Sequence, residues 1–214
     1  MTTTKPLTEE KHTLDHTILF DEVVKFHGHR CPGLSLGYRV ALVALREFAA
    51  ERAEDEELVA IVENNSCGVD AIQYVVGCTV GKGNLIFRDY GKHGYTFYHR
   101  KSGRGIRIYA DYFIIDSDDD TRYVELREKI SQGEATEADR EELRNLTEMR
   151  CQRILNAPEE QFIRIGPARE PMPQRAVSYR SIVCAFCGEK VMEPRSRICD
   201  GKICCIPCSC EATV

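Results

Sequence analysis

Several features that would place this 214-residue chain in a common class of proteins are missing from it. No stretch approaches the roughly 20 consecutive apolar residues that a membrane-spanning helix needs. Residues 1–6 lack the apolar core of a secretory signal. Basic residues are not in excess, since the formal net charge is −5, so the composition does not favour nucleic-acid binding. We therefore expect a globular, cytoplasmic protein without a membrane span.

A complete phosphate-binding loop is also missing. Residues 77–84 read Gly-Cys-Thr-Val-Gly-Lys-Gly-Asn and superficially resemble such a loop. One residue is lacking before the Gly-Lys pair, and Gly83 stands where a Ser or Thr would hold magnesium. The pattern therefore excludes a standard nucleotide loop, although its backbone N–H groups and Lys82 remain a weak candidate anion site.

Cysteine, by contrast, is abundant, with 11 residues in the chain. In a reducing compartment so many thiols indicate metal ligands or catalytic groups rather than disulfides. Seven of them lie between Cys184 and Cys210, and this asymmetry indicates two domains. The other four are spread over the preceding part of the chain: Cys31, Cys67, Cys78 and Cys151.

The most informative stretch is Phe26–Gly33, Phe-His-Gly-His-Arg-Cys-Pro-Gly. It places His27, His29 and Cys31 within five residues, in a turn fixed by glycine and proline. A helical apolar pattern follows, so Pro32 falls in the first helical turn and Cys31 at the helix N-terminus. There the helix dipole favours a thiolate. The stretch predicts either a soft-metal site or an activated nucleophile.

A second thiol is expected in a similar position. The apolar run Leu58–Val62 predicts a buried strand, and Cys67 follows at a strand-to-helix turn. Two helix N-termini that meet at one point would hold Cys31 and Cys67 as thiolates. With His27 or His29 they would supply three ligands and leave a fourth position open, as in catalytic zinc sites. The plainer alternative is that both cysteines only pack the helix starts.

Further along, turn residues separate short strand-like segments and indicate an antiparallel meander. Thr136–Asp139 has the pattern of a capping box that opens a helix. We expect Cys78 and Lys82 to line the pocket of the Cys/His site. The expected strands and helices cover residues 85–88, 95–99, 106–109, 123–130 and 161–165.

Residues 166–180 are rich in proline and predict a semi-rigid linker. We therefore expect a core domain over residues 1–165 and a small domain over residues 181–214.

The small domain contains two C-x-x-C motifs, Cys184-Ala-Phe-Cys187 and Cys205-Ile-Pro-Cys208. Two such turns complete the tetrahedral shell of zinc, and the spacing is typical of a zinc ribbon. So short a segment cannot bury enough core to fold alone, so the metal would supply much of its folding energy. The spacing leaves open whether one of the neighbouring thiols substitutes as a ligand: Cys199, Cys204 or Cys210.

Taken together, these motifs resemble the FmdE family, which is named after a component of formylmethanofuran dehydrogenase. The resemblance covers most of the chain, apart from residues 1–14 and parts of 110–165. It implies an α+β core, in which a mixed sheet is flanked by helices, with a metal-binding active site and a C-terminal treble-clef-like zinc finger. It also suggests a homodimer. The motifs that carry it span residues 26–37, 67–73, 77–84, 184–189 and 201–208.

The family name comes from members encoded beside a molybdenum or tungsten enzyme, and many relatives occur where that pathway is absent. The name therefore transfers no activity, and the sequence holds no recognisable motif for molybdopterin or an iron–sulfur cluster.

Three functions remain open at the level of sequence. The first is a core metal site with an unidentified small-molecule ligand, formed by Cys31 and Cys67 with His27 or His29. Its metal would be a second divalent ion, most simply zinc, although such ligands also take iron or copper. The second is a thiol-redox protein that uses Cys31, Cys67 or Cys78. The third is a non-catalytic accessory protein that docks onto a larger metalloenzyme complex.

Overall fold

The computed structural model describes residues 16–111 and 119–209. The chain divides into two compact units, Met1–Gln174 and Arg175–Val214. The division falls inside the segment that the sequence predicts as a linker, residues 166–180. Across the described ranges, no helix combines the length and the apolar character that crossing a membrane requires.

A five-stranded mixed sheet forms the centre of the first unit, in the order β2-β1-β3-β4-β5. Every residue of β1 is buried, which is typical of a central strand. β1 pairs in parallel with β2, and the remaining neighbours pair antiparallel. The strands are β1 (Leu58–Val62), β2 (Leu85–Phe87), β3 (Gly94–His99), β4 (Arg104–Ala110) and β5 (Ile163–Pro167).

The predicted antiparallel meander is therefore wrong for its first strand. β2 lies beside β1 and has no pairing with β3. The reason is the helical crossover between β1 and β2, made of α3 (Gly68–Ala71) and the π-helix η1 (Ile72–Val76). A parallel pair needs such a crossover, because a short turn joins only antiparallel strands.

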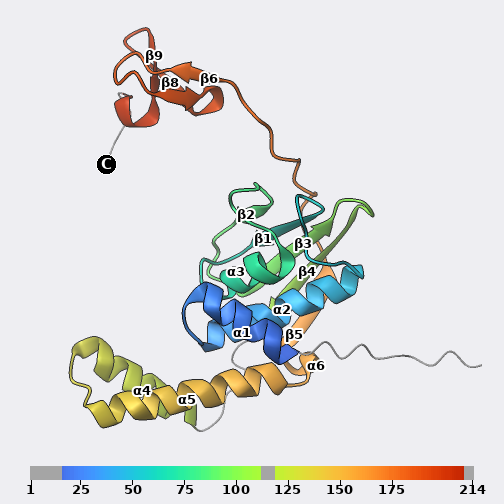
Figure 1. Ribbon diagram of the computed structural model, residues 1–214, viewed down its shortest axis with the longest axis vertical. Helices are drawn as coiled ribbons and strands as arrows, with labels where there is room; N and C mark the ends of the chain where they lie inside the picture. Colours follow the sequence, from blue (N-terminus) through green and yellow to red (C-terminus); the bar gives the residue numbers. More distant parts are fainter. Residues whose placement is uncertain (1–15, 112–118, 210–214) are drawn as a thin grey trace, which may run out of the picture. The chain divides into compact units, whose positions relative to one another are not determined.

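Helices cover one face of this sheet (Figure 1). The helix α2 (Pro32–Phe48) follows α1 (His16–His27), and Leu36 and Val40 of α2 belong to the main core with residues of β1, β3 and β4. The opposite face carries a smaller cluster in which Ala168 and Met172 pack against strand residues. The first part of the predicted linker therefore packs on the sheet.

A close contact between glycines joins α2 to α3. A methyl group added to Gly37 of α2 would lie 2.2 Å from the carbonyl oxygen of Gly68 and 2.4 Å from its Cα atom. A methyl group on Gly68 would in turn lie 3.0 Å from the carbonyl oxygen of Gly33. Only hydrogen fits at this crossing, so the two backbones approach more closely than helices with larger side chains can.

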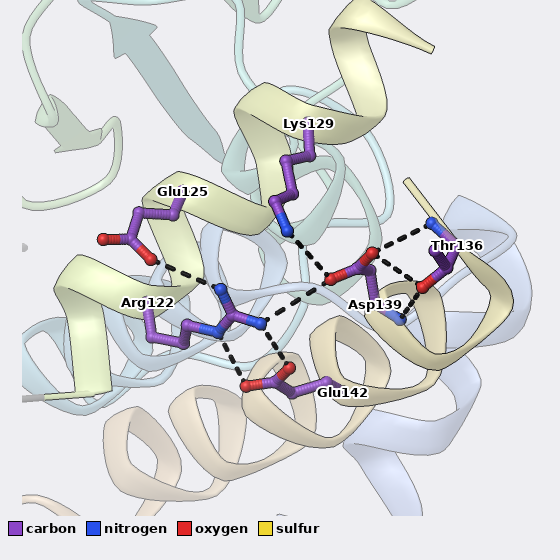
Figure 2. A network of polar contacts seen from close by, with 6 residues as sticks. All are labelled: Arg122, Glu125, Lys129, Thr136, Asp139 and Glu142. Atoms are coloured by element: carbon purple, nitrogen blue, oxygen red, sulfur yellow. Dashed lines mark hydrogen bonds and ion pairs between the residues drawn. The ribbon is translucent and has the colours of Figure 1, made fainter. Parts of the chain in front are cut away.

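Two further helices, α4 (Asp119–Gln132) and α5 (Glu137–Asn156), form an antiparallel pair linked by ionic contacts (Figure 2). Arg122 of α4 donates to both carboxylate oxygens of Glu142 of α5, at 2.8 and 2.7 Å. The predicted capping box is confirmed, because Thr136 and Asp139 exchange side-chain and backbone hydrogen bonds. Those bonds from Thr136 lower the pKa of Asp139 to about 2. The short helix α6 (Glu159–Phe162) then leads into β5.

The second unit consists of two small hairpins. The strands β6 (Ser181–Val183) and β7 (Lys190–Met192) form one hairpin, and β8 (Ser196–Cys199) and β9 (Lys202–Cys205) form the other. The single-turn helices η3 (Glu193–Arg195) and η4 (Ile206–Cys208) follow β7 and β9. The buried residues of this unit are mainly cysteines. The predicted α+β class, with a mixed sheet flanked by helices, is confirmed.

The glycine contact yields a first prediction. Gly37→Ala should lower the free energy of unfolding by about 1–3 kcal/mol, because the methyl group meets backbone atoms that cannot rotate away. Urea denaturation of the full chain measures this change. Gly33→Ala is the matched control on the same helix, since its methyl group would meet the Cβ atom of Cys67 at an ordinary 3.4 Å. Equal stability of the two variants would contradict the assigned contact.

Candidate metal centres

The turn between α1 and α2 places three of the candidate ligands. His27 is the last residue of α1, and Gly28 ends that helix with a positive φ of 96°, which glycine adopts without strain. Cys31 then caps α2, because its Sγ accepts a hydrogen bond from the backbone N–H of Leu34 at 3.4 Å. Pro32 occupies the first turn, as predicted. The local sequence therefore fixes the backbone positions from which these three side chains extend.

Cys67 comes from a different part of the chain, directly before α3. The turn after β1 is held by Asn64, whose side-chain oxygen accepts from the Ser66 hydroxyl at 2.7 Å. Its amide donates to the carbonyl oxygen of Lys92, also at 2.7 Å. These bonds fix the chain between the end of β1 and the start of α3. The glycine contact between α2 and α3 then sets Cys67 beside Cys31.

The structure brings His27, His29, Cys31 and Cys67 together. One candidate ligand atom from each lies within 4.8 Å of the others. The two imidazole rings are 4.4 Å apart between centroids. His29 is exposed, whereas the other three side chains are half-buried. Two nitrogens and two sulfurs suit a tetrahedral zinc with bonds of about 2.0–2.3 Å, so small side-chain movements would complete the shell.

His27 shows the clearest fit to a metal. Its Nδ1 lies 2.7 Å from a carboxylate oxygen of Asp70 on α3. Its Nε2 is buried and has no hydrogen-bond partner among the described residues. Such a buried polar atom is costly unless something else binds it. An imidazole held by a carboxylate on one nitrogen, with the other nitrogen left for a metal, is the usual arrangement of a metal-bound histidine.

Asp70 and Gln73 were not among the residues singled out from the sequence. Gln73 donates to the second carboxylate oxygen of Asp70 at 3.1 Å, which fixes the carboxylate that holds His27. Asp70 lies one helical turn after Cys67, so a search for a carboxylate near a candidate ligand would have found it. Its contact with His27 could not have been read from the sequence, because the two residues are 43 positions apart.

The expectation that the helix dipole keeps Cys31 deprotonated is wrong for the metal-free protein. Burial raises the pKa of Cys31 to about 11, against the lowering effect of the Leu34 N–H group. The neighbouring Cys67 thiol raises it further. The Cys31 thiol therefore does not ionise unaided near neutral pH, and a metal ion would bind it by displacing its proton.

Cys78 and Lys82 were predicted to line the same pocket, and the structure places them elsewhere. Cys78 is fully buried in the main core, and burial raises its pKa to about 12. Lys82 donates to the carbonyl oxygens of Ala53 and Glu54, at 3.2 Å each. The crossover explains this, because it returns the chain from the end of β1, near Cys67, to the beginning of that strand.

In the second unit the four predicted finger ligands come together. Sulfur atoms of Cys184, Cys187, Cys205 and Cys208 all lie within 4.8 Å of one another. The Sγ atoms of Cys187 and Cys205, one from each C-x-x-C motif, are 3.8 Å apart. Backbone N–H groups of Cys187 and Cys205 lower the pKa of Cys184 to about 6. Four thiols at this spacing could hold a metal ion in a tetrahedral shell.

The alternative thiols take other positions. Cys204 is buried, and its Sγ donates to the carbonyl oxygen of Arg197 at 3.6 Å. Cys199 is disulfide-bonded, so the expectation that the thiols do not form disulfides is wrong for this residue. Cys210 lies outside the described residues. Within the described part of the unit, the four thiols that lie together are therefore the same four that the two C-x-x-C motifs predict.

The fold and the two Cys-rich groups define a two-unit α+β protein with candidate metal sites. More specifically, the chain belongs to the family described as FmdE, Molybdenum formylmethanofuran dehydrogenase operon, which matches residues 26–164. This confirms the resemblance noted in the sequence. The matched segment includes His27, His29, Cys31 and Cys67, which we call the core group. It excludes the second unit, which holds the finger.

One curated relative and one solved structure extend the comparison. The chain is 33% identical over 176 residues to a "Probable S-adenosyl-L-methionine-binding protein" of Archaeoglobus fulgidus. The match covers 80% of this chain but only 48% of that relative, so the chain spans about half of the relative's length. A crystal structure of a tungsten formylmethanofuran dehydrogenase FmdE-like protein from Syntrophus aciditrophicus has a TM-score of 0.60. It is 19% identical and covers 92% of both chains, which supports the fold.

The contact between His27 and Asp70 can be tested through metal affinity. Asp70→Asn should weaken binding at the core group by about 10- to 100-fold, because the neutral amide orients the imidazole less firmly and makes it less basic. Competition with a chromophoric chelator measures this affinity in the full chain. Asp55→Asn, at an exposed carboxylate, is the control. An unchanged affinity in Asp70→Asn would show that the carboxylate does not support a ligand.

The finger offers a separate test. Cys187→Ser should release the finger metal and unfold residues 175–214, because the metal supplies most of the folding energy of so small a unit. The core should keep its structure, since it forms its own compact unit. Heteronuclear NMR spectra of the full chain report on both units at once. Ser209→Ala, beside Cys208, should leave the spectra and the metal content unchanged. Retention of the finger metal in Cys187→Ser would refute the ligand assignment.

Proposed function

We propose that the protein binds two metal ions. One, in the core, is held by His27, Cys31 and Cys67 with His29 as a fourth, exposed ligand. The other is a structural zinc in the finger, held by Cys184, Cys187, Cys205 and Cys208. The observation that carries the core site is the buried Nε2 of His27, which has no hydrogen-bond partner in the described part of the chain.

The core residues have distinct roles in this proposal. Asp70 holds the ring of His27, while α2 and α3 each present one thiol, so three ligands come from well-packed elements. His29 is exposed and lies where a ligand from solvent would approach. A divalent metal bound here would act as a Lewis acid toward a carbonyl or carboxylate, or would activate a water molecule. Exchange of His29 for a small molecule would open the site to substrate.

The alternatives receive less support from the same residues. A thiol-redox role needs a reactive thiolate, and burial raises the pKa of both Cys31 and Cys78. Docking to a larger enzyme and the expected homodimer stay predictions. The A. fulgidus relative is named for binding S-adenosylmethionine, and this chain matches only half of it. Because of that relative's name, S-adenosylmethionine should be among the compounds tested as ligands of the metal-loaded protein.

Metal content tests the proposal directly. The wild-type chain should carry about two metal ions, and Cys67→Ala about one, because the core group then loses a thiolate ligand. Elemental analysis by mass spectrometry gives the identity and the number of metal ions per chain. Cys78→Ala is the matched control, since it also removes a thiol but lies in the main core outside the ligand group. Equal metal content in the wild type and Cys67→Ala would overturn the core site.

A further inference from the structure

A second candidate site lies on the face of the sheet opposite to α2. A cavity of about 670 Å³ is formed there by β4, β5 and the segment that follows β5. Arg107 and Tyr109 of β4 line it. They alternate with Ile106 and Ile108, which belong to the core beneath α2, so their side chains point away from that core. The cavity is therefore separated from the Cys/His group by the sheet itself.

The charged residues that line this cavity are all basic: Lys92, Arg107, Arg164 and Arg169. Among the described residues, two carboxylates pair with them. Glu63 binds Arg107 through two hydrogen bonds of 2.6 and 2.7 Å, and Asp111 lies 3.6 Å from Arg164. Four cations against two carboxylates leave two positive charges. This excess stands out in a chain whose overall charge is −5.

The pair of Glu63 and Arg107 holds the centre of the cavity in place. Arg107 is only 9% exposed, and Glu63 occupies its Nε and Nη2 atoms. Its Nη1 makes no hydrogen bond to the described residues. A methyl group on Gly94 would lie 2.4 Å from Arg107 Nη2 and 2.6 Å from Glu63 Oε2, so the strand keeps room for this pair. The hydrogen bond from Arg107 lowers the pKa of Glu63, and the nearby Lys92 and Arg169 lower it further.

The remaining walls are apolar. Tyr109 and Ala168 line the cavity beside the cations, and Tyr109 lies opposite Arg164 on the same face of the sheet. The guanidinium of Arg164 lies 5.9 Å from the centre of the Tyr109 ring. Small-molecule sites commonly combine this volume with apolar walls and a few fixed polar groups.

We propose that this cavity binds a small organic phosphate. Arg107, held by Glu63, would donate to the phosphate, and Lys92, Arg164 and Arg169 would balance its charge. A phosphate monoester carries a charge close to the excess of two, and guanidinium groups match its oxygens with paired hydrogen bonds. Tyr109 and Ala168 would pack against the organic part of the molecule. This site does not depend on the metal centre.

Calorimetric titration of the full chain with adenosine 5′-monophosphate and with inorganic phosphate tests the proposal. Adenosine monophosphate should bind more tightly than inorganic phosphate, because it also buries apolar surface. Arg169→Ala should raise the dissociation constant for adenosine monophosphate about tenfold, as expected for the loss of one charged contact. Lys101→Ala removes the same charge from an exposed turn outside the cavity and should leave this constant unchanged.

Several results would overturn the proposal. One is the absence of binding of either compound at millimolar concentration, and another is equal weakening by Arg169→Ala and Lys101→Ala. A third is binding of single-stranded RNA that adenosine monophosphate does not compete with, which would identify the face as a nucleic-acid surface. The Cys67→Ala variant should bind adenosine monophosphate like the wild type. The phosphate proposal therefore does not fail if the metal proposal fails, and the metal proposal does not fail if the phosphate proposal fails.

Discussion

Two glycines set the distance between α2 and α3, and the core ligand group depends on that distance. Gly37 meets Gly68 so closely that a methyl group on the former would lie 2.2 Å from the carbonyl oxygen of the latter. The two helix starts converge on the same point, so a thiol placed at each start comes within metal-binding reach of the other. Any side chain at this crossing would separate the helices and, with them, Cys31 from Cys67.

The two histidines of the core group differ in their polar contacts and in their exposure to solvent. His27 is held by Asp70, which Gln73 holds in turn, and its free nitrogen is buried. His29 directly follows Gly28 in the sequence and is exposed to solvent. In the proposed site, a fixed and an exposed histidine from the same short turn would give one anchored and one accessible ligand, the arrangement that ligand exchange requires.

Features encoded locally could be predicted from the sequence. Cys31 before Pro32 marks the start of a helix, Thr136–Asp139 forms the expected capping box, and the finger thiols follow from motif spacing. Features that depend on distant contacts could not. The parallel pairing of β2 with β1 moved Cys78 and Lys82 away from the expected pocket. Burial decided the protonation of Cys31, and burial follows from the packing of elements far apart in the chain.

The crossing of α2 and α3 is formed by backbone atoms. The place of residue 67 in the core group therefore does not depend on which side chain it carries. Position 67 is set by Gly68 and Gly37, neither of which contributes a side chain. Exchange of the cysteine there for histidine or aspartate would change the softness of the site while the main chain stayed in place. In the proposed core site, single substitutions would therefore change the metal preference without redesign of the fold.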